Sequence, residues 1–156
     1  MTDRDLLRHA LAVLAYRGGK VIRAAPPSFA AFDTGGGNTP IVILAHLGDL
    51  LDWALTHARG EPKWVAANPG TWDQGVARFH ASLAALDAYL ASDEPVRAEL
   101  TRILAGPIAD ALTHVGQIAM LRRMAGCATI GENYFVADIV TGRVGADQSP
   151  PVRPFQ

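Results

Sequence analysis

Four long stretches of this sequence space their apolar residues at intervals of three and four, as an α-helix does. This pattern limits the possible folds more than any other feature of the chain. The stretches cover about residues 3–23, 40–59, 72–90 and 92–125, and connectors rich in Gly and Pro separate them. No stretch keeps the apolar–polar alternation of a β-strand. Because amphipathic helices bury their apolar faces against one another, we predict an all-α fold, an up-down-type four-helix bundle.

The starts and ends of these helices carry recognisable signals. Three starts are marked by a threonine cap, which is followed either by a polar partner three residues on or by a proline: Thr2 with Asp5, Thr71 with Gln74, and Thr39 with Pro40. The dipeptide Gly106-Pro107 predicts a break or bend within the fourth helix. Gly126 is a natural end for that helix.

We predict a single helical-bundle domain over residues 1–156, since this length suits a single core. Its helical core covers residues 3–125, and residues 126–156 form an irregular C-terminal arm without helical period. The arm nevertheless holds several large apolar residues: Ile130, Tyr134, Phe135, Ile139, Val144 and Phe155. We therefore expect it to fold onto the bundle.

Charge and cysteine content narrow the class of function. The chain has 14 basic and 15 acidic residues, a net charge of −1, and no basic stripe, so we expect no nucleic-acid partner. The longest apolar run, residues 41–45, is far shorter than the ~20 residues of a membrane span. No secretory signal pattern opens the sequence. One unpaired cysteine, Cys127, fits a reducing compartment. We expect a cytoplasmic protein that acts on a small molecule, away from membranes.

The second helix carries a histidine on its apolar side. At ~100° per residue, His46 falls in one stripe with Leu50, Trp53 and His57. An isolated histidine in such a stripe is most often a core residue with one hydrogen bond. His57 lies eleven positions further, ~16 Å along the axis, so the two imidazoles cannot share an ion. Asp49 is either a residue that orients His46 or, the better interpretation, a solvated carboxylate.

The fourth helix places a carboxylate, an imidazole and an amide in line. Asp110 and His114 are four residues apart and share a face, which Gln117 continues. Burying these groups is costly unless something satisfies them. One alternative is a divalent cation held by Asp110, His114 and His46, with an open coordination position. The other is a hydrogen-bonded cluster in which Asp110 pairs with one of the histidines. Spacing alone favours neither.

The segments ILAHLGDLLDW, which carries His46, and DALTHVGQIAMLRRMAG, which carries His114 and Gln117, resemble the DinB-like (YfiT-like) metalloenzyme superfamily. The resemblance covers roughly residues 3–125, and the C-terminal arm looks like the tail of one branch of that family. It implies a four-helix bundle, usually a homodimer, in which three histidines hold a divalent metal, commonly zinc or nickel.

One residue departs from the family pattern. Asp110 stands where the family usually has the first histidine of the fourth helix. Two histidines and one carboxylate suit zinc or nickel, and also harder ions such as manganese and iron. The change is equally compatible with a site that has lost its metal. Glu132 in the arm is a less favoured replacement ligand.

Two functions from different classes follow. Family members of known activity resemble thiol-dependent transferases and isomerases that use a low-molecular-weight thiol, and others are hydrolases. The resemblance thus implies a metal-dependent transferase or hydrolase in which His46, Asp110 and His114 hold the ion and Gln117 orients a ligand. The alternative is a non-catalytic bundle that binds a ligand or partner and whose metal site is degenerate.

Overall fold

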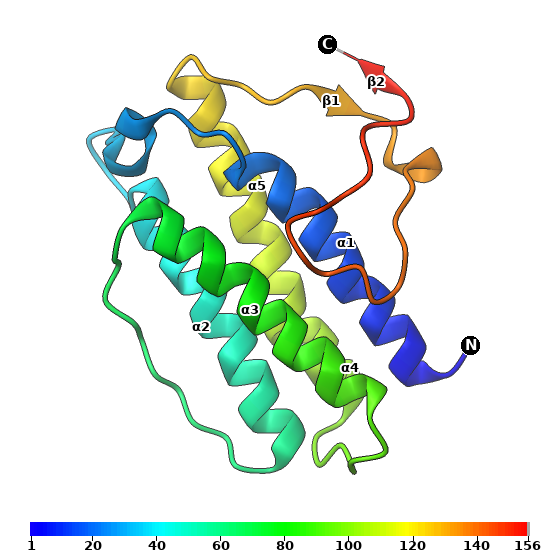
Figure 1. Cartoon of the computed structure of the whole chain (residues 1–156). Coiled ribbons are helices and arrows are strands. Elements are labelled where there is room, and N and C mark those ends of the chain that lie inside the picture. The colour runs from blue at the N-terminus through cyan, green and yellow to red at the C-terminus, as the bar shows by residue number, and fades with distance from the viewer. Residues whose placement is uncertain (156) are drawn as a thin grey trace.

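The computed structural model describes residues 1–155 and confirms the all-α four-helix bundle (Figure 1). The bundle consists of α1 (Asp3–Ile22), α2 (Pro40–Arg59), α3 (Trp72–Ala91), α4 (Leu100–Ile103), the π-helix η2 (Leu104–Ile108) and α5 (Ala109–Met124). The last three are continuous and form the fourth helical stretch. The remaining elements are short: the 3-10 turns η1 (Pro27–Ala31) and η3 (Tyr134–Val136), and the strands β1 (Gly131–Glu132) and β2 (Pro154–Phe155).

The predicted helix signals act as expected at most ends. Both capping boxes form, at Thr2 and at Thr71. Thr39 is the N-cap of α2, although its side chain makes no capping hydrogen bond. Gly126 has a φ of +73° and follows the end of α5, where the next N–H donates to the carbonyl of Arg122 at 2.9 Å. Local sequence therefore fixes where these helices begin and end.

The fourth helical stretch begins later than predicted, at Leu100 and not near residue 92. Ser92 ends α3, because its backbone is extended, with φ −80° and ψ 171°. The segment that follows is tied to α2 instead, since the N–H of Arg97 donates to the carbonyl of Ala58 at 2.8 Å. Residues 92–99 are thus a connection held by contacts to two helices.

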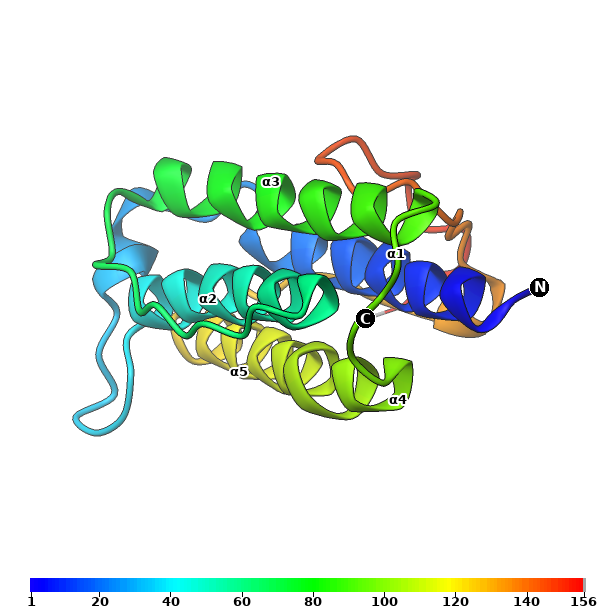
Figure 2. The ribbon, with the colours of Figure 1, turned by 90° about the horizontal axis from the view of Figure 1, so that it is seen from below.

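The four helices surround the core in the order α1, α3, α2, α5 (Figure 2). Of the neighbouring pairs, α1 is antiparallel to α3 and α2 to α5, whereas α5 and α1 run the same way, and so do α2 and α3 (Figure 1). This is possible because the connection 60–71 returns along the outside of the bundle. A helix of 20 residues is about 30 Å long, and an extended connection of this length can span it. The bundle is therefore up, down, down, up.

The core is a single apolar cluster to which all four helices contribute. The closest helix contact is at Gly18 of α1, where a Cβ atom would lie only 2.6 Å from Cζ of Phe79 on α3 and 3.4 Å from Cγ2 of Val115 on α5. Glycine lowers the stability of a helix interior, yet α1 continues through Gly18 to Ile22. The glycine instead lets three helices approach one another.

The C-terminal arm packs along α1, as predicted (Figure 1). Glu132 anchors it: this carboxylate is 3% exposed and accepts hydrogen bonds from the Tyr16 hydroxyl and the Lys20 ammonium, both at 2.9 Å. Further along, His80 of α3 donates from Nδ1 to the carbonyl of Val144 at 3.2 Å. Burial lowers the pKa of His80. The two strands close the arm on itself, with Gly131 opposite Phe155.

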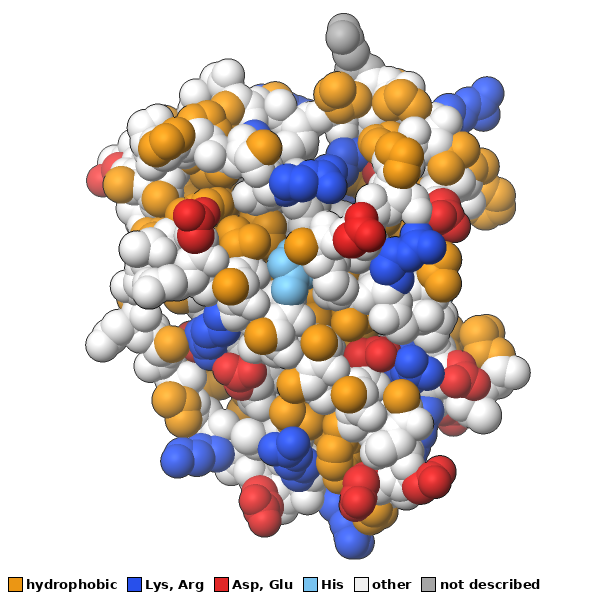
Figure 3. Space-filling view, viewed as in Figure 1, with side chains coloured by type: hydrophobic (Ala, Val, Ile, Leu, Met, Phe, Trp, Pro, Cys, Tyr) orange, Lys and Arg blue, Asp and Glu red, His pale blue; other side chains and the backbone are white. Residues whose placement is uncertain are grey.

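One helix of residues 1–155, α2, is long and apolar enough to cross a membrane, and 56% of its apolar window is buried inside the bundle. Burial of this kind is what a core helix shows. On the face that Figure 3 displays, acidic and basic side chains are interspersed, and apolar side chains gather at the upper right, where the arm lies.

Candidate metal centre

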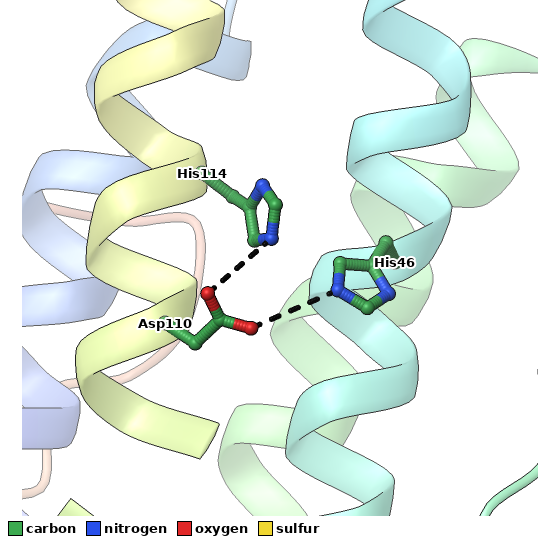
Figure 4. A group of neighbouring side chains, drawn as sticks. All are labelled: His46, Asp110 and His114. Carbon is green, nitrogen blue, oxygen red and sulfur yellow. Dashed lines mark ion pairs between the residues drawn. The ribbon is translucent and has the colours of Figure 1, made fainter. Parts of the chain in front are cut away.

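Two antiparallel neighbours, α2 and α5, bring the three predicted ligands together (Figure 4). His46 lies in the first half of α2. Asp110 and His114 lie one turn apart at the start of α5 and point toward it. One ligand atom from each of the three residues lies within 4.8 Å of the others. The helical spacing that predicted a shared face for Asp110 and His114 is therefore realised, and the third group comes from the facing helix.

The carboxylate of Asp110 lies between the two imidazoles without bonding to either. Nε2 of His114 is 3.5 Å from Oδ1 of Asp110, and Nε2 of His46 is 3.9 Å from Oδ2. Both distances exceed the 2.7–3.2 Å of an N–H···O hydrogen bond. Ligands about 2.0–2.2 Å from a tetrahedral ion lie about 3.4 Å from one another. The closer of the two donor pairs is near this separation, and all three ligand atoms lie within 4.8 Å of one another, so the residues form a possible metal-binding triad.

Gln117 fixes the orientation of one imidazole. Its Oε1 is 2.8 Å from Nδ1 of His114. Because an amide oxygen only accepts hydrogen bonds, Nδ1 is the donor in this contact, and in a neutral imidazole Nε2 is then the nitrogen with the lone pair. A hydrogen bond of this kind on the outer nitrogen is typical of histidines that bind metals. The structure thus places Gln117 behind His114, and the predicted contact of Gln117 with a ligand stays a prediction.

The three side chains lie near the surface. The exposed fractions are 18% for His114, 33% for His46 and 49% for Asp110. A buried structural site would close all four positions of a zinc ion with protein ligands, whereas three ligands at an open surface leave room for a further molecule. The exposure of Asp110 therefore points to an accessible centre.

A tryptophan from the connection 60–71 covers one side of His46. The ring of Trp64 lies 5.6 Å from the imidazole of His46 and 5.7 Å from the indole of Trp53, both edge to face. Two hydrogen bonds from backbone N–H groups hold this connection against α2. Lys63 donates its N–H to the Thr56 hydroxyl at 3.1 Å, and Ala67 donates its N–H to a carboxylate earlier in α2. Trp64 lies between these two residues of the connection.

That carboxylate is Asp49, and the interpretation of it as a solvated side chain is wrong. It is 4% exposed, and its Oδ1 accepts from the N–H of Ala67 at 3.1 Å and from Arg78 of α3 at 2.8 Å. Asp52 pairs with the same guanidinium at 2.7 Å. The face of α2 that carries these acids is covered by Arg78, so Asp49 holds the connection and does not orient His46.

Glu132 is not a replacement ligand. Its two oxygens are used by Tyr16 and Lys20 of α1, and it is outside the cluster of His46, Asp110 and His114. Burial and the hydrogen bond to Glu132 raise the pKa of Tyr16 to about 12. The role of this glutamate is to fasten the arm.

We compared the chain with protein-family models, with curated proteins and with solved structures. None of the three comparisons finds a match. The candidate centre therefore rests on the geometry of its own residues.

Proposed function

We propose that His46, Asp110 and His114 hold a divalent cation and that the chain is a metal-dependent enzyme of the thiol-dependent transferase or hydrolase type. The observation that supports this most directly is the gap between the three groups. Two imidazole Nε2 atoms and one carboxylate converge on it at distances too long for mutual hydrogen bonds. Because two imidazoles and a carboxylate that converge without bonding one another match the donor set of a divalent cation, a cation is their simplest common partner.

Each residue has a distinct task in this proposal. Asp110 supplies the negative charge, and the two histidines bind as neutral ligands, one of them held in the correct tautomer by Gln117. The donor set of two imidazoles and a carboxylate suits zinc, nickel, manganese or iron. A cation in such a site lowers the pKa of a thiol or water that binds it, which gives a nucleophile near neutral pH. Trp64 limits access from the side of His46.

Metal analysis of the full chain, purified without an affinity tag, tests the proposal. We expect about one equivalent of metal per chain, lost in His46→Ala and kept in His9→Ala. The control histidine lies on α1 and contacts Thr141. Zinc, nickel or manganese at 100 times its dissociation constant should stabilise the native state by about 2.7 kcal/mol, which raises the melting temperature by about 5–10 °C. Metal content that survives His46→Ala contradicts the assignment.

A second candidate function is a non-catalytic bundle that binds a ligand or partner. The observation that favours it is that Asp110 lies within ion-pair distance of both imidazoles, so protonated histidines alone could balance its charge. In that case neither chelator nor added zinc, nickel or manganese shifts the melting temperature. The same measurement therefore separates the two functions.

We further propose that the protein works in the cytoplasm as a homodimer on a small-molecule substrate, and that neither nucleic acid nor a membrane is its partner. A molar mass from light scattering equal to one chain would contradict the dimer.

A further inference from the structure

Two adjoining hollows lie beside the candidate metal centre, between the second half of α2 and the π-helix η2. Their volumes are about 430 and 420 Å³, within the 300–1,000 Å³ typical of small-molecule sites. Trp53, Ala105 and Gly106 line both of them. The first extends to Ile103 and Pro107, and the second extends to Asp110. The two hollows therefore adjoin, and the second one reaches the carboxylate of Asp110.

The space arises from the sequence of the π-helix. Pro107 lies inside the helix and has no N–H for the usual i to i−4 bond, so the turn is widened. Gly106, just before it, has no side chain, and a Cβ atom there would meet no atom within 4 Å. The missing bond and the missing side chain leave room opposite Trp53. Single π turns inside α-helices are frequent at functional sites.

The first hollow is lined chiefly by apolar groups. Two ionisable side chains line it, His57 and Arg102. Arg102 is 81% exposed and already pairs with Glu99 at 3.0 Å, so its charge is directed to solvent. The ring of Trp53 packs edge to face on His57 at 4.7 Å, which leaves the indole as a large apolar wall. A wall of this kind binds hydrocarbon and offers no counter-charge for a buried anion.

We infer that the first hollow binds an alkyl or aromatic group of a small molecule whose polar end lies at Asp110. The position of the polar end rests on the proposed metal centre, whereas the apolar pocket stands on its own lining. The substrate class is then an amphiphilic small molecule, with the reacting group at the ion and a hydrocarbon part of several carbons against Trp53. Substrates that are polar along their whole length are disfavoured, because burying them here leaves hydrogen bonds unmade.

Binding of neutral straight-chain alcohols, from ethanol to octanol, tests the hollow without involving the metal. Each added methylene should raise the affinity about fourfold until the space is filled, as measured by calorimetry and by shifts of the Trp53 indole signal in NMR spectra. In Ala105→Phe the affinity for hexanol should fall at least tenfold, because the ring occupies the space that both hollows share. Leu104→Phe is the matched control, since it is in the same turn but does not line either hollow, and it should change the affinity less than twofold.

An affinity that does not rise with chain length overturns the inference, as does a series that Ala105→Phe leaves unchanged. If Ala105→Phe does not fold, the wild-type spectrum decides, because hexanol must then shift Trp53 and Gly106 more than residues of α1. Metal content is measured on the same samples. Loss of metal binding with an intact alcohol series contradicts the proposed function and leaves the apolar pocket standing.

Discussion

Replacing Gly18 by alanine should destabilise the protein, although the same replacement in a helix interior usually stabilises. Alanine is about 1 kcal/mol more favourable than glycine inside a helix. At Gly18 the new methyl carbon would lie 2.6 Å from Cζ and 3.1 Å from Cε1 of Phe79, whereas carbon atoms in contact are 3.5–4.0 Å apart. Phe79 is fully buried and cannot swing away without displacing its neighbours.

Overpacking of this kind costs about 1–3 kcal/mol, and the close overlap places Gly18 toward the upper end. After the helix gain is subtracted, we expect a net loss of about 1–2 kcal/mol in the free energy of unfolding. Gly116 on α5 supplies the matched comparison, because a Cβ atom there meets nothing within 4 Å. Gly116→Ala should therefore stabilise by up to about 1 kcal/mol.

Urea unfolding followed by circular dichroism measures the free energy of unfolding of both variants, and thermal unfolding measures their melting temperatures. The two melting temperatures should differ by about 2–12 °C, since each kcal/mol shifts a domain of this size by about 2–4 °C. In a Phe79→Leu background the cost of Gly18→Ala should shrink, because the ring that it strikes is gone. Equal stability of Gly18→Ala and Gly116→Ala would refute the steric argument.

Two further predictions concern the arm and the connection. The pKa of Tyr16 is about 12 in the folded chain and ~10 in the unfolded chain. Its stabilising effect is therefore complete below pH 10 and is lost as the pH rises to 12, by up to about 2–3 kcal/mol. The free energy of unfolding of Tyr16→Phe should depend less on pH over that interval, and an unchanged slope would contradict this role of Tyr16. Asp49→Asn should lower the free energy of unfolding by about 1–3 kcal/mol and speed hydrogen exchange at the Ala67 amide. Asp52 is half-exposed, so Asp52→Asn should lower it by under about 1 kcal/mol. Equal losses in the two variants would contradict the role of Asp49 in holding the connection.

Local signals in the sequence were sufficient for most of the fold. The capping boxes at Thr2 and Thr71 involve residues three apart, so the information that fixes those helix starts lies within one turn. The direction of α3 could not be read in this way. It depends on the path of the connection 60–71, which its own sequence of Gly, Pro and Asn does not specify.

The candidate centre was predictable in part for a similar reason. Asp110 and His114 share a face by helical spacing, and the place of His46 on the apolar stripe of the second helix made it the candidate third ligand. No signal in the sequence around Asp49 predicts its ion pair with Arg78, which lies on a different helix. Likewise, no signal around Trp64 predicts its contact with His46. Such contacts follow from packing between distant segments, so they appear only when the bundle is assembled.

The origin of Trp64 separates two properties that proteins often combine in one element. The three candidate ligands stand on rigid helices, while the indole beside them belongs to a connection held to α2 at two points. Residues between those two points can change without moving the helices that carry His46, Asp110 and His114. Variation around Trp64 would therefore alter the surroundings of the candidate centre and leave its scaffold in place.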